Sequence, residues 1–178
     1  MKYLIASDLH GSKFYAEKLF ERFESEKADM LILLGDLFNH GPRNPLPKDY
    51  SPMEVADLLN KNKEKLIVIK GNCDSEVDTM ISDFDFVENL CLTITDKTFF
   101  LTHGHVYNKD KMPKTNFSAV IYGHFHVGFI EKQGETIIAN AGSLSLPKNQ
   151  SPNSYIILTE KALTLKDLSG KTIKEIQV

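Results

Sequence analysis

The sequence lacks several features that would place it outside the cytoplasm. Its two cysteines, Cys73 and Cys91, are too few for a disulfide framework in 178 residues. No apolar run approaches the roughly 20 residues that a membrane helix needs. Met1 and Lys2 lead straight into an apolar run, with no cleavable signal segment. We therefore expect a cytoplasmic protein with no membrane partner.

The chain also lacks an excess of one charge. Its formal net charge is -3 and its pI is about 6.1, so it has no general attraction to nucleic acid or anionic lipid. Positive and negative residues are mixed along the chain, and there is no low-complexity tract, repeat or linker. An extended nucleic acid is not an expected partner, and residues 1–178 are predicted to form one domain.

In the first half of the chain, short apolar runs alternate with residues at helical spacing. Ser12 is the expected N-cap of the first helix. The continuous apolar runs are typical of strands that are covered on both faces. The predicted order is strand 3–6, helix 15–23, strand 30–34, helix 53–59 and strand 66–69.

From about Leu90 onward, the pattern changes to strands of period two. The predicted strands are 90–95, 98–102, 120–122, 129–132, 136–139, 155–158, 163–168 and 173–178. Together with the first half, this pattern predicts an α/β protein with two facing mixed β-sheets.

Five polar motifs follow apolar runs, each at the end of a predicted strand. They are Asp8-Leu9-His10-Gly11, Gly35-Asp36, Gly71-Asn72-Cys73-Asp74, His103-Gly104-His105 and Gly123-His124-Phe125-His126. Open α/β sheets place their ligands at these strand ends. If the strand geometry persists beyond the first run, Asp8 and His10 project on the same side. One motif alone would carry little weight, but the ordered set predicts a dinuclear metal site.

The types of ligand limit which metals can bind and which reaction they would catalyse. Imidazole, carboxylate and amide groups without clustered thiols favour Mn, Fe, Zn, Ni or Co over calcium or an iron-sulfur cluster. Two such ions bridged by one carboxylate polarise a phosphoryl oxygen and lower the pKa of a bridging water to give hydroxide. We therefore expect hydrolysis of a phosphate ester.

From Met1 to about Pro147, the chain resembles the calcineurin-like metallophosphoesterase superfamily, in particular its small phosphodiesterases of the YfcE type. The five motifs carry the resemblance, together with residues 35–44 and Asn140-Ala141-Gly142-Ser143. It implies a four-layer sandwich of two mixed sheets flanked by helices, two divalent ions, with Mn²⁺ the first choice, and a homodimer or homotetramer. It also implies ligands for one metal, Asp8, His10, Asp36 and His126, and for the other, Asp36, Asn72, His103 and His124.

The chain departs from that family at Cys73, where most members have a histidine that is thought to protonate the leaving oxygen. A neutral thiol, with a pKa of about 8.5, is a poorer proton donor at neutral pH than an imidazolium. We therefore expect weak activity on esters with poor leaving groups, or a substitute acid at His40 or His105. Cys73 could also bind metal, although the family's ligand set is complete without it.

The residues around these motifs have two interpretations each. Arg43 could clamp a phosphate or pair with a surface acid, and we favour the clamp. His40 could bind substrate or be an ordinary core or surface histidine. Asp74 could support the site or lie in a solvated turn. Asn140 and Ser143 are expected to hold a turn, and Phe84, Phe86, Phe99 and Phe100 to lie in the core.

The predicted function is hydrolysis of small phosphodiesters, with three alternatives. The same centre could serve a phosphomonoesterase or a cyclic-nucleotide phosphodiesterase. In a different class, the chain could be a protein-binding scaffold, like the retromer subunit that has a similar fold and a degraded site. The complete ligand set argues against the scaffold.

Overall fold

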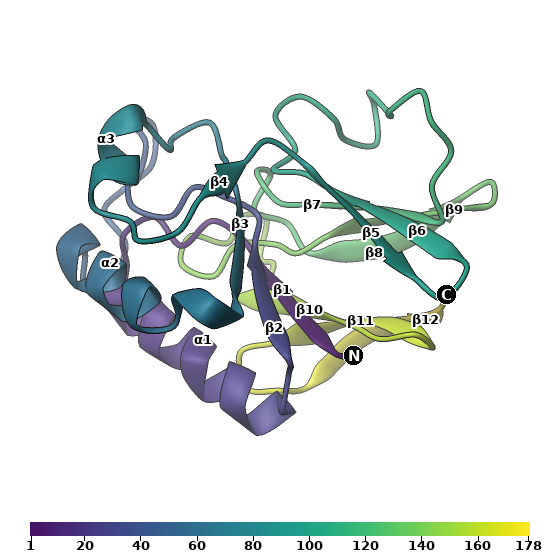
Figure 1. The fold of residues 1–178 in the computed structure, drawn as a ribbon, viewed down its shortest axis with the longest axis horizontal. Coiled ribbons are helices and arrows are strands. Elements are labelled where there is room, and N and C mark those ends of the chain that lie inside the picture. Colours follow the sequence, from purple (N-terminus) through teal and green to yellow (C-terminus); the bar gives the residue numbers. More distant parts are fainter.

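The computed structural model, which describes residues 1–178, consists of two β-sheets packed face to face with three α-helices on one side (Figure 1). The strands are β1 (Tyr3–Ala6), β2 (Met30–Leu33), β3 (Leu66–Ile69), β4 (Phe86–Val87), β5 (Leu90–Ile94), β6 (Lys97–Leu101), β7 (Ala119–Tyr122), β8 (Phe129–Gln133), β9 (Thr136–Asn140), β10 (Ser154–Leu158), β11 (Ala162–Asp167) and β12 (Thr172–Gln177). The helices are α1 (Lys13–Glu26), α2 (Pro52–Lys61) and α3 (Glu76–Met80), with a 3₁₀ turn at Lys63–Lys65.

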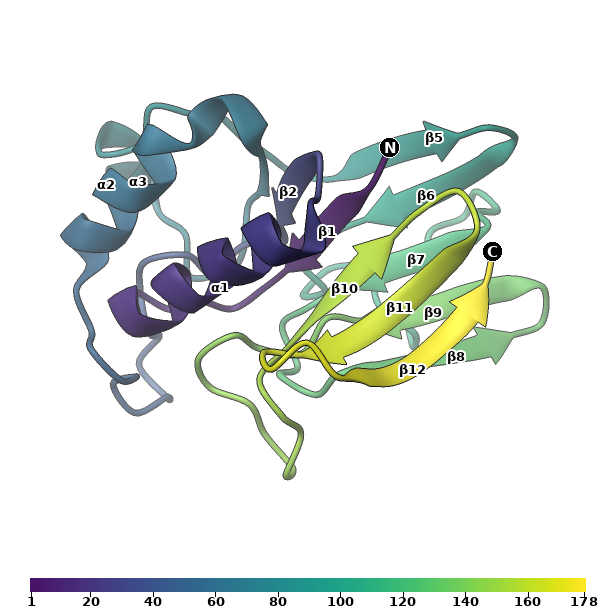
Figure 2. The ribbon, with the colours of Figure 1, turned by 90° about the horizontal axis from the view of Figure 1, so that it is seen from below.

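Both sheets mix parallel and antiparallel pairs, which confirms the predicted fold class. The seven-stranded sheet has the order β12-β11-β10-β1-β2-β3-β4, in which β1 to β4 are parallel and β10 to β12 are antiparallel. The five-stranded sheet has the order β5-β6-β7-β9-β8, with β6, β7 and β9 parallel and both edge strands antiparallel. Figure 2 shows β12 at the edge of the first sheet, where it contacts β8 of the second.

The continuous apolar strands of the first half serve two separate cores. Ile5 and Ile32 pack between the sheets, in one cluster with Phe99 and Ile121 of the second sheet. Their neighbours along the strands face the other way, toward the helices, in a cluster that contains Leu4, Leu31, Leu33, Leu19 and Leu59. Because both faces of β1 and β2 are buried, neither strand shows an alternation of apolar and polar residues.

The second sheet is covered on its outer face by a loop instead of a helix. Phe100, Val120, Tyr122 and Ile138 are buried there beneath side chains of residues 107–117. Burial alternates along β5, as predicted for this half of the chain, but every residue of β7 and β10 is buried, so the predicted period of two is wrong for these two strands. The loop covers β7, whereas Tyr155 and Ile157 of β10 pack in the helix-side core.

All the predicted elements are present, with ends that differ from the predicted ones by at most three residues, but the elements between residues 75 and 88 were not predicted. Ser12 is the N-cap of α1, and its Oγ accepts a hydrogen bond from the Tyr15 N–H at 3.3 Å. Helix α3 and strand β4 were not predicted, because they contain only five and two residues. Phe84 and Phe86 are partly buried against the helix-side core. None of the helices is long and apolar enough to cross a membrane.

Candidate metal centre

The five motifs lie in turns at the C-terminal ends of five parallel strands. These strands are β1, β2 and β3 in one sheet and β6 and β7 in the other. Backbone hydrogen bonds hold neighbouring turns together. The His10 N–H donates to the Asp36 carbonyl at 2.9 Å, and the Gly123 N–H donates to the His103 carbonyl at 2.8 Å. The placement expected from the sequence is confirmed, and it brings both sheets to one site.

Five of the seven candidate ligands have left-handed backbone. The φ angles are 57° at Asp8, 51° at His10, 56° at Asp36, 64° at His124 and 61° at His126. The expectation that strand geometry persists to Asp8 and His10 was wrong, because β1 ends at Ala6. The two side chains nevertheless converge, with His10 Nε2 3.6 Å from Asp8 Oδ1. Each such conformation costs on the order of 1–2 kcal/mol, and such strain is typical of functional sites.

Asp8, His10 and His126 form the first ligand cluster. The Nε2 atoms of the two histidines are 3.2 Å apart, and His126 Nε2 is 3.1 Å from Asp8 Oδ1. Both rings use Nδ1 against a backbone carbonyl, at 2.7 Å for His10 and 2.6 Å for His126, so their Nε2 lone pairs face each other.

A cation bound between these Nε2 lone pairs and Asp8 Oδ1 would remove the repulsion between them. Asp8 Oδ1 is buried and has no hydrogen-bond partner. Ligand atoms around a single ion lie roughly 3 to 3.5 Å apart, since each is about 2.1 Å from the ion. The first cluster therefore fits a divalent metal.

Asp36, His103 and His124 form the second cluster, and Asn72 lies beside it. The Nε2 of His103 is 3.2 Å from His124 Nδ1 and 3.0 Å from Asn72 Oδ1. Asp36 lies between the clusters, because its Oδ2 is 3.5 Å from His103 Nε2 and 3.9 Å from His10 Nε2. A third group of possible ligand atoms combines His10, Asp36 and Cys73.

The charges in these clusters perturb the pKa values. Burial opposes ionisation of Asp8, but His10 and His126 outweigh it and hold the pKa of the carboxyl well below its ordinary value. Burial also opposes the charged form of His103, but Asp36 and Asp8 raise its pKa to about 9. Burial and the neighbouring His103 lower the pKa of His124 to about 4. Two ionised carboxylates in a buried site favour a bound cation.

Asp74 supports the turns and does not line the cavity. Its two carboxylate oxygens accept hydrogen bonds from the backbone N–H groups of Asp36, Leu37 and Gly71 at 2.7 to 2.8 Å. Burial and the Asp36 charge raise its pKa to about 6. Of the two interpretations of Asp74, the supporting one agrees with these contacts.

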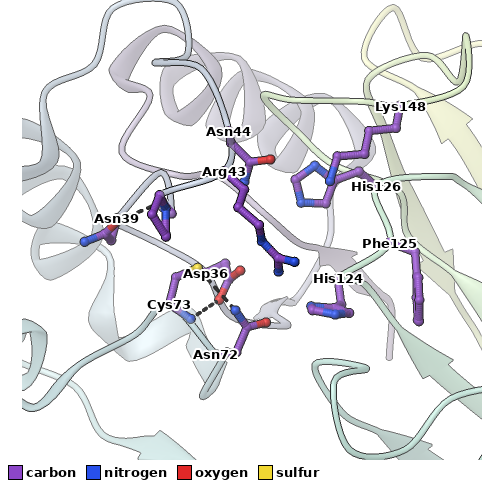
Figure 3. A pocket seen from close by; sticks show the side chains of 12 residues that line it. Asp36, Asn39, Arg43, Asn44, Asn72, Cys73, His124, Phe125, His126 and Lys148 are labelled. Carbon is purple, nitrogen blue, oxygen red and sulfur yellow. Dashed lines mark hydrogen bonds between the residues drawn. The ribbon is translucent and has the colours of Figure 1, made fainter.

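A cavity of about 780 Å³ opens over the two clusters, and its lining includes Asp36, Asn72, His124 and His126 (Figure 3). The Arg43 guanidinium points into this cavity, toward Asp36 and His124. Lys148 lines it from the opposite loop. No salt bridge involves Arg43 or Lys148. The pairing of Arg43 with a surface acid is therefore not observed.

The candidate proton donors have different positions. Cys73 lines the cavity, and burial and the Asp36 charge raise the pKa of its thiol to about 12. His105 is exposed, with its ring centroid 5.4 Å from that of His103, and it is not among the cavity residues. His40 packs edge-on against Tyr50 and also lies outside the lining. Only Cys73 of the three therefore faces the cavity.

Asn140 and Ser143 were expected to hold a turn, and their side chains bind the turns at Gly123 and Asp8 respectively. Ser143 Oγ donates to the Asp8 carbonyl at 2.8 Å, and Asn140 Nδ2 donates to the Gly123 carbonyl at 2.7 Å. Lys148 and Phe125 also line the cavity, and neither was predicted from the sequence to do so. Phe125 could have been noticed as a large apolar residue between His124 and His126, but no local pattern marks Lys148.

Comparisons with known proteins agree with this site. The profile of the calcineurin-like phosphoesterase superfamily domain matches residues 1–162. The chain is 41% identical to phosphodiesterase YfcE of Escherichia coli K12 over 175 residues, which covers 97% of this chain and 95% of the relative. A solved structure of the phosphoesterase YfcE from E. coli matches with a TM-score of 0.96 at 38% identity and covers 100% of both chains.

A more distant similarity concerns the fold alone. Vacuolar protein sorting 29 from Cryptosporidium parvum matches with a TM-score of 0.64 at 18% identity, covering 99% of this chain and 98% of that one.

The calcineurin-like phosphoesterase family implies divalent metal ions, and the two ligand clusters fit them. From the profile match, the near-complete alignment and this geometry, we conclude that the chain belongs to the calcineurin-like phosphoesterase superfamily.

Proposed function

We propose that the protein hydrolyses small phosphodiesters with two divalent metal ions, of which manganese is the first candidate. The single observation that carries this proposal is the position of Asp36. Its Oδ2 faces His10 Nε2 of one ligand cluster and His103 Nε2 of the other, at 3.9 and 3.5 Å. One carboxylate in this position can be shared by two ions. The 41% identity to a phosphodiesterase supports the choice of substrate class.

The candidate ligands divide between two ions. Asp8, His10 and His126 would hold one, and Asn72, His103 and His124 would hold the other, with Asp36 common to both. When bound, such ions polarise a phosphoryl oxygen and lower the pKa of a water to near neutrality. The ligand histidines cannot rotate freely, because the Nδ1 atoms of His10, His103 and His126 are hydrogen-bonded to backbone carbonyls.

Two cationic side chains would bind the substrate's phosphate. Arg43 reaches into the cavity from residues 37–52, and Lys148 lines the other side. A guanidinium can bind two phosphoryl oxygens at once, and an ammonium acts as a point charge. A diester carries one negative charge, which these groups neutralise without a further anion site.

The neutral Cys73 thiol favours diesters with good leaving groups. A leaving alkoxide or unsubstituted phenoxide needs a proton, whereas 4-nitrophenolate or another weakly basic oxyanion does not. Because an ordinary thiol has a pKa of about 8.5, Cys73 is a poorer proton donor at neutral pH than the imidazolium that most family members have at this position. Esters of acidic alcohols or phenols are therefore the expected substrates.

The test is hydrolysis of bis(4-nitrophenyl) phosphate beside 4-nitrophenyl phosphate, by metal-stripped protein with and without added Mn²⁺. We expect Mn²⁺-dependent turnover of the diester, weak turnover of the monoester, and loss of at least 100-fold in Asp36→Asn, in line with the removal of a principal catalytic group. Faster turnover of the monoester would favour a phosphomonoesterase. Failure of every divalent metal to support turnover would favour a binding scaffold.

A further inference from the structure

A second compartment adjoins the cavity over the metal ligands. It has a volume of about 290 Å³, and Phe125 lines both spaces. Its other apolar lining residues are Tyr122, Val127 and Phe129, and its polar ones include Lys109 and Asn149. The cavity over the metal ligands contains only two hydrophobic residues among its twelve, so the two spaces differ in chemistry.

The three rings of the compartment pack around the buried Tyr122. Tyr122 is buried, and its ring meets Phe125 and Phe129 edge-on, with centroid distances of 6.1 Å in both cases. The Tyr122 hydroxyl accepts a hydrogen bond from the Lys109 N–H at 3.3 Å, and Lys109 Nζ lies 5.7 Å from the centre of the Phe129 ring. A preorganised set of rings costs little conformational entropy when a ligand binds.

Phe125 is the residue that needs explanation. It stands between two candidate ligands, and its ring lies 5.0 Å from that of His124, yet 45% of the residue is exposed. Core packing does not account for a large apolar side chain in this position. Contact with a flat apolar group would remove its surface from water and add favourable ring contacts.

We infer that this compartment binds an aromatic substituent on the ester oxygen that stays bonded to phosphorus during hydrolysis of the diester substrate. The inference rests on the proposed function, because it assumes that the phosphate occupies the adjoining cavity. Phe125 is then the specificity residue that lies between the phosphate and the ring. Lys109, Asp110 and Asn149 make up the polar part of the lining. The preferred substrates are therefore aryl or other ring-bearing diesters over alkyl diesters.

The test compares 4-nitrophenyl phenyl phosphate with 4-nitrophenyl ethyl phosphate. In both, water attacks phosphorus, the bond to the nitrophenyl oxygen breaks, and 4-nitrophenolate leaves, so the retained substituent is the variable. We measure the ratio of kcat/KM for the phenyl and ethyl esters in the wild type and in Phe125→Ala. Intrinsic differences in reactivity cancel when the ratios of the two proteins are compared. We expect the ratio to fall about five- to tenfold in the variant, mainly through KM for the phenyl ester.

Further variants separate a lost ring contact from a disturbed metal site. Phe129→Ala lies on β8, outside the ligand turns, and is expected to lower the same ratio. Ile173→Ala on β12 is the matched control, because Ile173 is also 45% exposed, and it should leave the ratio unchanged.

Two results would overturn the inference while leaving the proposed function intact. One is an equal loss for both esters in Phe125→Ala. The other is an unchanged ratio with a change of oligomeric state, measured by light scattering, which would make this face an interface between copies of the chain. If the wild type hydrolysed neither ester with any divalent metal, the proposed function itself would fail.

Discussion

The orientation of each ligand depends on a partner at its second polar atom. His10, His103 and His126 donate from Nδ1 to the carbonyls of Asn39, Leu34 and Leu146. This fixes Nε2 as the atom with the free lone pair. The sequence motifs predicted the three histidines as ligands. They could not predict the carbonyl partners, which lie 29, 69 and 20 residues away in the chain.

Replacing Cys73 with His should introduce a proton donor at the cavity. Cys73 lines the cavity and lies near His10 and Asp36, so an imidazole there can reach a leaving oxygen. We expect Cys73→His to raise kcat for ethyl phenyl phosphate by at least about tenfold, since general acid catalysis typically contributes 10² to 10⁴. The assay is phenol release, compared with turnover of the 4-nitrophenyl diester.

The control for this variant is Cys91→Ser, on β5, where the cysteine is exposed and outside the cavity. It should leave both activities unchanged. If Cys73→His did not alter the ratio of phenyl to 4-nitrophenyl release, Cys73 would not limit protonation of the leaving group.

The turns that follow the strands are built around close backbone contacts. A Cβ added at Gly71 would lie 2.4 Å from the Asp36 backbone N and 2.2 Å from Asp36 Oδ1. The left-handed backbone at Asp8, Asp36 and the histidines was not predictable, because residues with a Cβ disfavour it and only the surrounding contacts enforce it.

Gly71→Ala should displace Asp36 and weaken binding of both ions. We expect metal content, measured by plasma mass spectrometry after dialysis, to fall by at least half while the circular dichroism spectrum remains native. Gly134→Ala is the control, because no atom lies within 4 Å of the added Cβ, although its φ of 62° should cost about 1 kcal/mol. Full metal content in Gly71→Ala would contradict the assigned role of Asp36.

The strands show where burial can be predicted from the pattern of apolar residues and where it cannot. Sequence runs such as those of β1 and β2 predicted burial on both faces, and this is confirmed. For β7 and β10 the expected alternation is absent, because loop or helix side chains cover the face that an exposed sheet would show to water. Whether both faces of a strand are buried depends on how the layers assemble, so it cannot be predicted from the sequence of that strand alone.

At the scale of the molecule, one charged residue ties helix α1 to the first sheet. Glu26, the last residue of α1, forms salt bridges with Lys2, before β1, and Lys166, on β11. The Tyr155 hydroxyl on β10 also donates to it at 2.9 Å. Burial opposes ionisation, but Lys166, Lys2 and Tyr155 lower the pKa of Glu26 to about 2.

This shift makes the stability of the fold dependent on acid pH. A lowered pKa in the folded state contributes stability above the unfolded value of 4.5, and this contribution is lost as pH falls toward 2. We expect Glu26→Gln to lower the free energy of unfolding of metal-free protein by about 2 kcal/mol at pH 7 and by much less at pH 3. Urea unfolding at both pH values measures this, with Glu24→Gln as control. An equal loss at both pH values would contradict it.

The two sheets together place one set of ligands at the point where their strand ends meet, and we propose that this set holds two metal ions. The most direct test is the number of metal ions per chain. Plasma mass spectrometry of protein reconstituted with Mn²⁺ and then dialysed should give about two ions per chain for the wild type. Asp36→Asn should give fewer than one, because it weakens both sites. A wild-type value near zero, or a value of two that Asp36→Asn leaves unchanged, would contradict a dinuclear centre bridged by Asp36.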